Sequence, residues 1–393
     1  MEQNTQNPKI YTLNFWLLCS SSLLFFTSFN MIIPELPDYL TSLGGEEYKG
    51  YIISIFTLSA GLSRPFSGKL TDRVGRVPVM VVGVVVSCVC TLFYPLIGSV
   101  AAFLLIRFFH GFSTGFKPTG TSAYLADIVP FERRGEALGI LGFCSSTGIG
   151  LGPIVGSWLA LETDLNTMFY CASGISLLSI LILSGLKETL ENPEKLRLEH
   201  FNIKRNEILD KNALSPSIVM LLCTTSYGVI LTLIPDYSKS LGIENKGMFF
   251  MFFTGASMLV RVFAGRLSDR YGRLPVLKFS TLMLMISLLW IGFVSSELEL
   301  YLGAIVLGLG IGTNSPTLYA WTIDRSNPMH RGRAIATMYI ALEIGIGLGA
   351  LGSGYIYANE ISQIGWSFIL SGIFCLLAFL YVTFAPLREK RLN

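Results

Sequence analysis

The sequence carries little charge for its length. Only 14% of its 393 residues are Asp, Glu, Lys or Arg, whereas 51% are hydrophobic. Soluble domains carry about 25% charged residues, so this chain lacks the polar surface that a protein of its size needs in water. Its mean hydropathy of +0.57 agrees, and together these values indicate a membrane protein.

The chain also lacks the residue patterns that mark several other classes of protein. It has only three His residues, and its seven Cys residues lie in apolar runs without paired spacing. The glycine-rich segments also lie inside apolar runs rather than after a strand, and we find no nucleophile motif and no metal-ligand cluster. We therefore expect free thiols, no metal, no cofactor and no nucleic-acid partner. An enzyme, or a receptor with its own sensing domain, is disfavoured.

Twelve apolar segments are long enough to cross a bilayer, which takes about 20 helical residues. They lie near residues 15–37, 50–68, 78–97, 101–126, 137–160, 167–186, 216–236, 247–265, 276–295, 299–323, 334–357 and 364–385. The sequence therefore predicts an all-α protein with twelve transmembrane helices. We expect an N-terminal bundle (1–186), a cytoplasmic linker (187–214) and a C-terminal bundle (215–393).

Basic residues predict the orientation of the chain. If the N-terminus lies inside, only Lys49, Lys239 and Lys246 fall in connections on the outer side, while most of the 29 Lys and Arg residues fall in the inner ones. Cytoplasmic connections are enriched in Lys and Arg. We therefore expect both termini in the cytoplasm, in a multi-pass protein of the bacterial cytoplasmic (inner) membrane.

The two halves of the chain repeat each other. Matching segments recur 197 or 198 residues later: 37–39 at 235–237, 68–76 at 265–273, and 148–152 at 345–349. Because six spans separate the copies, both halves have the same topology. Parallel repeats of this kind are related by an axis along the membrane normal, with a substrate site at their interface. The repeat predicts two pseudo-symmetric six-helix bundles around a cavity.

Three motifs carry a family resemblance. The duplicated Gly-x-Leu-x-Asp-Arg-x-Gly-Arg loop resembles the signature of the major facilitator superfamily, and Arg107 with Gly111 resembles an element of its fourth span. The third motif resembles that of the proton-coupled antiporter branch and comprises Gly148, Gly152, Pro153 and Gly156. The resemblance implies the major facilitator fold, in a monomeric carrier close to the twelve-helix drug:proton antiporters.

The duplicated loop is expected to act as a conformational latch. Arg76 lies level with Asp127, and Arg273 would pair with Asp324 in the second half. The resemblance implies that Asp72 caps the start of the eleventh span. These contacts would hold the halves together on the inner side; alternatively, the charges only enforce topology. The latch set comprises Gly68, Asp72, Arg73, Gly75, Arg76, Asp127, Asp269, Arg273 and Asp324.

The glycines of the antiporter motif fall on one face of the fifth span. Small residues at this spacing let another helix approach closely. Pro153 removes a backbone hydrogen bond and is expected to bend the helix. A smooth face between the halves would seal the cavity against ion leak, and plain helix packing is the alternative.

Glu343 is the leading candidate for proton coupling, because charged residues inside spans are costly and usually mark function. It sits near the middle of the eleventh span. The alternative is a permanently protonated Glu that bonds to a neighbouring helix. Arg107, Asn30 and Glu35 lie at similar depth and are expected to meet, which adds Glu35 and Arg107 to the proton-coupling set.

Lys117, near the middle of the fourth span, has three possible roles. It would bind an anionic substrate group, pair with Glu343 across the halves, or extend towards the membrane surface. For Arg64 we expect a similar extension or pairing within the loop network. The predicted substrate-binding set, in which each member has packing as its alternative, is Asn30, His110, Lys117, Tyr227, Asn314, Tyr319 and Tyr339.

These observations predict a secondary active transporter. The favoured function is proton-coupled antiport that exports small amphipathic, drug-like molecules by alternating access. Its partners would be the substrate, protons and membrane lipids. The alternative is an exporter or importer of a specific, possibly anionic metabolite, such as a sugar, a siderophore or a lipid-linked glycan.

Overall fold

A computed structural model describes residues 11–130, 133–202, 209–326 and 331–389. These residues form helices joined by short connections, and no strand occurs among them. Every one of the twelve predicted spans coincides with a long helix. The all-α fold predicted from the apolar segments is therefore confirmed.

The N-terminal half supplies the first six spans. Helix α1 is continued by the short 3-10 helix η1 and by α2, and the three together form one span. Their bounds and those of the next five helices are α1 (Leu13–Met31), η1 (Ile33–Glu35), α2 (Leu36–Ser42), α3 (Lys49–Arg73), α4 (Arg76–Phe93), α5 (Val100–Ile128), α6 (Arg134–Glu162) and α7 (Leu165–Ser184).

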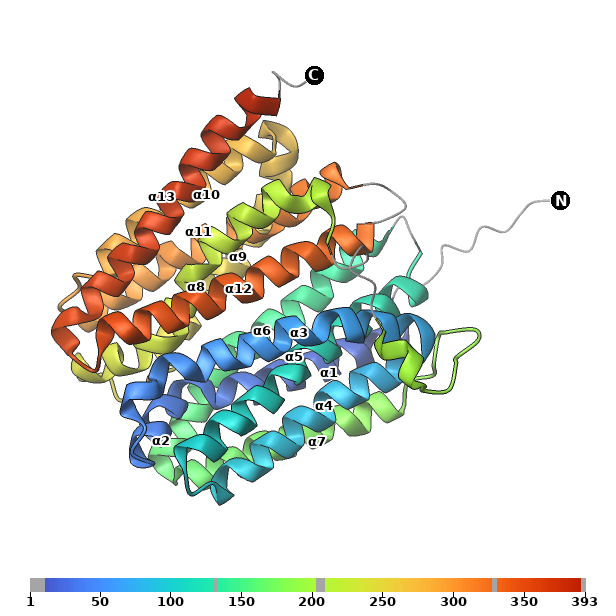
Figure 1. Cartoon of the computed structure of the whole chain (residues 1–393), viewed down its shortest axis with the longest axis horizontal. Coiled ribbons are helices and arrows are strands. Elements are labelled where there is room, and N and C mark those ends of the chain that lie inside the picture. Colours follow the sequence, from blue (N-terminus) through green and yellow to red (C-terminus); the bar gives the residue numbers. More distant parts are fainter. Residues whose placement is uncertain (1–10, 131–132, 203–208, 327–330, 390–393) are drawn as a thin grey trace.

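The C-terminal half repeats this arrangement after the connection that contains η5 (Leu198–Phe201) and η7 (Lys211–Ala213). Its six long helices are α8 (Leu214–Ser240), α9 (Met248–Tyr271), α10 (Arg273–Ile291), α11 (Glu297–Arg325), α12 (Arg331–Tyr357) and α13 (Ile364–Glu389). Helices α1–α7 form one bundle and α8–α13 the other, which lies above it in Figure 1. Helix α1 begins and α13 ends on the same face, the termini face.

Composition explains why some spans are harder to recognise than others. Within the described residues, nine helices are long and apolar enough to cross a membrane, and a tenth passes if the bent helix α9 is one span. Helices α3 and α5 do not pass, and they carry the cations Arg64, Arg107 and Lys117. Arg107 and Lys117 are fully buried, and the Arg64 side chain is only 12% exposed and paired with Glu343, so the lipid does not have to accommodate these charges.

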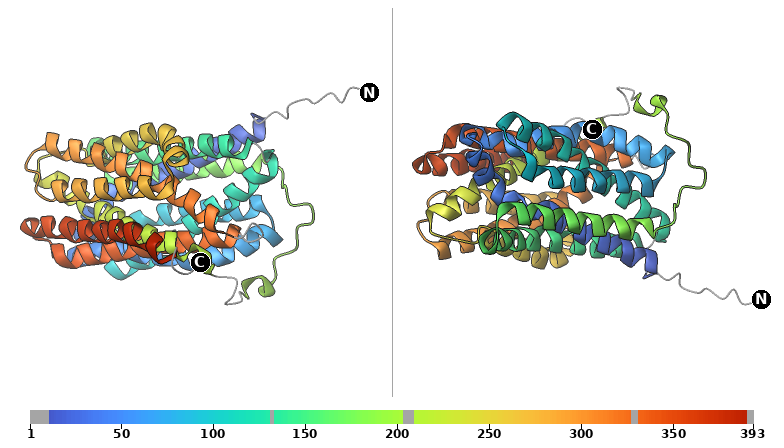
Figure 2. Two further views of the ribbon diagram at one scale, coloured as in Figure 1. Left: turned by 90° about the horizontal axis from the view of Figure 1, so that it is seen from above. Right: turned by 90° about the horizontal axis from the view of Figure 1, so that it is seen from below.

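The two bundles meet along two seams. Helix α3 packs on α12, and α6 packs on α9. In Figure 2 the C-terminal bundle lies in front in the left view and the N-terminal bundle in the right view. Close approach requires small residues at these crossings. A Cβ added to Gly50 of α3 would lie 2.9 Å from the Ala350 carbonyl oxygen, and one on Gly354 would lie 2.6 Å from Gly50 Cα. The bundles therefore touch through their backbones at this point.

Candidate functional site between the bundles

Glu343 of α12 lies at the seam with α3, with only 6% of its surface exposed. Its Oε1 atom accepts a hydrogen bond of 2.5 Å from Nη2 of Arg64, which belongs to the other bundle. The Arg64 guanidinium also lies over the Tyr339 ring, 4.8 Å from its centre. Arg64 therefore turns towards α12 rather than into the loop network, which corrects the sequence-based expectation for this residue.

A cavity of about 900 Å³ follows the same seam. Its walls come from one face of α3 and one face of α12. Phe201 and Asn202, in the segment between α7 and α8, close one end. Several wall residues, such as Leu58 and Leu348, are more than half exposed on the outer surface of the bundles. The cavity is mostly apolar, and Glu343 is the one carboxylate among its lining residues. This arrangement suits a molecule with a large apolar body and a small polar group.

The other predicted proton-coupling residues do not meet Glu343 or one another. Arg107 is fully buried in the N-terminal bundle, where its Nε donates to the Ile52 carbonyl over 2.9 Å and its guanidinium lies over Phe56. Asn30 donates to the carbonyl of Phe26 in its own helix. The expected meeting of Arg107, Asn30 and Glu35 is therefore wrong, because each side chain is held by a different partner.

Lys117 is fully buried and donates to the Ser22 hydroxyl over 2.6 Å. It therefore neither pairs with Glu343, whose partner is Arg64, nor extends to the surface. His110 is fully buried as well, between the hydroxyls of Ser87 (3.2 Å) and Tyr94 (3.3 Å).

The remaining members of the predicted substrate-binding set lie in the C-terminal bundle. The Asn314 amide donates to Ser280 over 3.0 Å, and the Tyr227 ring lies tilted beside Phe253, 6.1 Å between ring centres. Tyr319 packs against the hydrophobic core. No member of the predicted set lines the seam cavity, although Tyr339 contacts Arg64 beside it. Their role in substrate binding stays a prediction.

The two ion pairs expected in the duplicated loops form. Arg76 Nε lies 2.9 Å from Asp127 Oδ2, and Arg273 Nε lies 2.8 Å from Asp324 Oδ2. Both partners of each pair belong to one bundle, however. The expectation that these pairs bridge the halves is therefore corrected, and their role as a latch stays a prediction.

Other members of the latch set form ion pairs with nearby residues or are at least partly exposed at the surface. Asp269 pairs with Arg273, Arg73 pairs with Glu194 of the connection, and nothing lies within 4 Å of a Cβ built on Gly68. The Asp72 side chain is 75% exposed, with Arg76 at 3.7 Å. The start of α12, which Asp72 was expected to cap, adjoins residues outside the described ranges.

Glu188 caps the N-terminus of a helix, as was expected of Asp72, but the helix is α4. Its carboxylate accepts hydrogen bonds of 3.0 Å from the backbone N–H groups of Arg76 and Val77, at the start of α4. The preceding residue, Gly75, has a φ of +141°, and a Cβ there would lie 2.5 Å from this carboxylate. Gly75 of the duplicated loop thus makes room for an anion at a helix N-terminus.

The glycine motif packs within a bundle. Cβ atoms on Gly148, Gly152 and Gly156 would lie 2.5, 2.6 and 1.9 Å from backbone oxygens of α1. The expected smooth face between the halves is therefore wrong for these residues. Gly150, on another side of α6, faces Thr254 of α9 instead.

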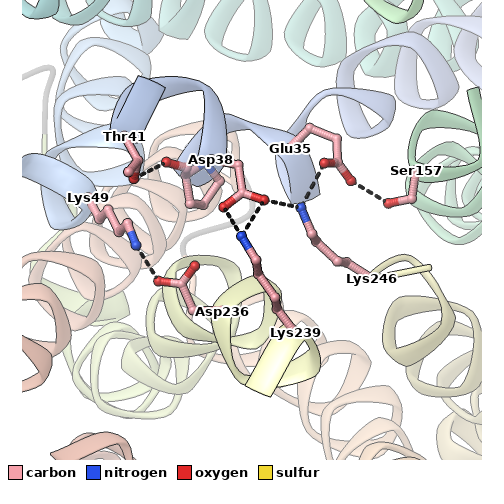
Figure 3. Close-up of polar contacts among 9 residues, drawn as sticks. Glu35, Asp38, Thr41, Lys49, Ser157, Asp236, Lys239 and Lys246 are labelled. Carbon is pink, nitrogen blue, oxygen red and sulfur yellow. Dashed lines mark hydrogen bonds and ion pairs between the residues drawn. The ribbon is translucent and has the colours of Figure 1, made fainter. Parts of the chain in front are cut away.

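A network of six charged residues joins the bundles at the face opposite the termini (Figure 3). Lys49 binds Asp236 at 2.6 Å; Lys246 binds Asp38 at 2.7 Å and Glu35 at 2.8 Å; Lys239 lies 3.3 Å from Asp38. Burial opposes the charge on Lys246, but the carboxylates of Glu35 and Asp38 outweigh it and raise its pKa. We call these residues the ion network: Glu35, Asp38, Lys49, Asp236, Lys239 and Lys246.

Sequence reasoning missed most of this network. Glu35 was chosen for its position in a span, whereas its partners are Lys246 and the Ser157 hydroxyl at 2.7 Å. Two signals were available. Lys49, Lys239 and Lys246 are the basic residues of the connections that the sequence predicts to lie outside, and Asp38 and Asp236 occupy matching positions in the repeat.

Two bundles of six spans, with a cavity along the seam between α3 and α12, define a multi-pass integral membrane protein with carrier architecture. The chain belongs to the Major Facilitator Superfamily, whose family model matches residues 18–260 and 216–393. Among solved structures, it resembles a D-xylose-proton symporter (TM-score 0.76, 17% identity, 94% of this chain and 96% of that one). It also resembles the human organic anion transporter MFSD10 (TM-score 0.71, 18% identity, 94% and 98%).

Sequence relatives include several bacterial proteins. The chain is 27% identical to multidrug resistance protein MdtG of Klebsiella pneumoniae over 88% of this chain and 86% of the relative. It is 28% identical to a multidrug resistance efflux pump PmrA homologue of Lactococcus lactis over 74% and 75%. It also matches multidrug resistance protein 2 of Bacillus subtilis at 28% identity, but spans only 58% of that protein.

Proposed function

We propose that the protein is a proton-coupled antiporter that exports small amphipathic molecules by alternating access. The observation that carries this proposal is the Glu343–Arg64 pair, a buried carboxylate bound across the seam at 2.5 Å. Protonation of Glu343 would remove its charge and leave Arg64 without its counter-ion. Because the two residues belong to different bundles, proton binding would change a contact on which the relative position of the bundles depends.

The cavity supports the choice of substrate class. Its walls are mostly apolar, and its single lining carboxylate favours molecules that are amphipathic and neutral or cationic. The names of the bacterial relatives, which are multidrug resistance proteins, agree with this class. Under the metabolite alternative, Lys117 and Arg107 would favour an anionic substrate. Both are held inside the N-terminal bundle and do not line this cavity.

The remaining parts of the proposal follow from the sequence. The distribution of Lys and Arg favours cytoplasmic termini, and the bacterial relatives favour the inner membrane. We further propose a monomer without enzymatic activity, divided at the connection 187–214 into bundles 1–186 and 215–393.

The test is transport by the purified protein in liposomes with an imposed pH gradient, using cationic, neutral and anionic amphipathic compounds. The wild type should transport the cationic and neutral ones against their gradients. Glu343→Gln keeps the shape of the side chain and a hydrogen-bond acceptor for Arg64, but cannot bind the proton. It should lower gradient-driven transport about 10- to 100-fold, as expected for the loss of a charged hydrogen bond.

The matched control is Glu360→Gln, which removes the same charge from an exposed position after α12. It should transport at the wild-type rate. Undiminished pH-driven transport by Glu343→Gln would refute the proposed role of this residue.

A further inference from the structure

In the ion network, residues at matching positions of the two repeats form equivalent ion pairs across the interface. Asp38 and Asp236 occupy matching positions in the two halves, and so do Lys49 and Lys246. Each Asp binds the Lys of the other half, at 2.7 Å for Asp38 with Lys246 and 2.6 Å for Asp236 with Lys49. Two equivalent ion pairs therefore cross the interface in opposite directions, as the pseudo-two-fold axis requires.

Water has little access to three of the four side chains in these two pairs. Lys49 and Asp236 are 11% and 8% exposed; Lys246 is 10% exposed, and its partner Asp38 is 31% exposed. Breaking a buried ion pair without new partners is strongly unfavourable, because each charge is then left desolvated and alone. The pairs are thus able to hold the bundles together at this face until water or other charges reach them.

The use of lysine points to a specific role. Lys and Arg are avoided in outer connections, yet Lys49, Lys239 and Lys246 are found there, and all three belong to the network. The N-terminal bundle contributes two carboxylates and one lysine, whereas the C-terminal bundle contributes one carboxylate and two lysines. Within the network, the share of the N-terminal bundle is therefore net negative and that of the C-terminal bundle net positive, and the two shares attract each other.

Backbone contacts close the space around the network. A Cβ on Gly247 would lie 2.3 Å from the Pro153 carbonyl carbon of α6, so the connection with Lys246 presses directly on the other bundle. Asn245 donates to the Ile154 carbonyl at 3.3 Å. On the seam between α3 and α12, the hydroxyls of Tyr51 and Tyr355 lie 2.6 Å apart. Tight contacts on both seams thus flank the network.

We propose that the ion network is the gate of the transport pathway on the face opposite the termini. Asp38–Lys246 and Asp236–Lys49 seal this face when they form, and both must separate each time the pathway opens there. This inference rests on the proposed function, because alternating access requires that such an opening occurs.

Distances between spin labels test the gate without measuring transport. The labels are placed on Ser42→Cys and Ser240→Cys, exposed matching serines at the ends of α2 and α8. The seven native cysteines are replaced by serine. In the full-length protein, reconstituted in lipid, we expect mainly short distances. Lys49→Asp should raise the ratio of long to short distances about tenfold or more, because it places like charges opposite each other.

The exchange variant, Lys49→Asp with Asp236→Lys, separates loss of the pair from misfolding. It restores opposite charges and should return the short distances. Lys239→Asp, which changes the charge at an exposed position, should shift the ratio much less. The proposal is overturned if Lys49→Asp leaves the distances of the parent protein unchanged, or if the exchange variant folds but stays as separated as Lys49→Asp.

The two proposals fail in different ways. If the distances respond as expected but no compound is transported, the gate stands and the proposed function fails. If transport depends on Glu343 but the spin-label distances do not change on charge reversal, the proposed function stands and the proposed gate fails.

Discussion

The two faces of the protein use the same kind of ion pair for different connections. Near the termini, Arg76–Asp127 and Arg273–Asp324 each join two helices of one bundle. At the opposite face, Lys49–Asp236 and Lys246–Asp38 join the two bundles. Pairs of the first kind can persist while the bundles move as rigid bodies, whereas pairs of the second kind must break.

Burial sharpens this difference for Lys49–Asp236. The carboxylates of Asp127 and Asp324 are 30% and 48% exposed, and that of Asp38 is 31% exposed, but that of Asp236 is only 8% exposed. Water can replace a lost partner at the termini face far more easily than at Asp236. The comparison teaches that a charged motif recognised in sequence is not necessarily the one that links moving parts.

The largest effect is expected when the buried centre of the network is reversed. Lys246→Glu would place three carboxylates together, and removing one partner of a buried pair costs about 3–5 kcal/mol. The transport rate in liposomes should fall at least about 100-fold. Lys195→Glu, the same change at an exposed position of the connection, is the control. A properly inserted Lys246→Glu protein with the wild-type rate would contradict the account.

An intermediate effect is expected at the termini face. Arg76→Gln removes the partner of Asp127 and should lower the free energy of unfolding by about 1–2 kcal/mol, since the Arg76 side chain is 14% exposed. Its transport rate should fall much less than that of Lys246→Glu. Denaturant unfolding in detergent, with Arg273→Gln as the matched variant, measures the loss. Transport as poor as in Lys246→Glu, with unchanged stability, would instead make this pair a link between the bundles.

The smallest effect is expected at the edge of the network. The Lys239 side chain is 66% exposed and lies 3.3 Å from Asp38. Exposed ion pairs contribute about 0.2–1 kcal/mol, so Lys239→Ala should change the unfolding free energy by no more than this. Its transport rate should stay near that of the wild type. A severe transport defect in Lys239→Ala would show that exposure does not rank the members of the network.

Local sequence patterns were enough to predict the helices and the pairs within a bundle. The apolar runs located every span, and the repeat located Arg76–Asp127 together with its counterpart Arg273–Asp324. Helices α3, α5, α6, α8 and α11 extend beyond both ends of their apolar runs. Helix α11, for example, has 29 residues, about 44 Å, against a hydrocarbon thickness of about 30 Å.

Contacts between the bundles were not predictable in the same way. Arg64 and Glu343 are 279 residues apart, and no periodicity relates α3 to α12. Depth in the membrane was used to group Arg107, Asn30 and Glu35, but depth does not determine which side of a helix a residue occupies. The exchanged pairs of the ion network required the repeat to be considered together with the lysines of the connections predicted to lie outside.

The central claim is that two rigid bundles move against each other, so that one face closes as the other opens. Spin-label distances at both faces of one preparation test it most directly: Ser42 with Ser240 opposite the termini, and Ser184 with Thr383 on the termini face. On lowering the pH or adding substrate, the account predicts that the two distances change in opposite directions. Distances that change together, or not at all, in a protein that transports would contradict it.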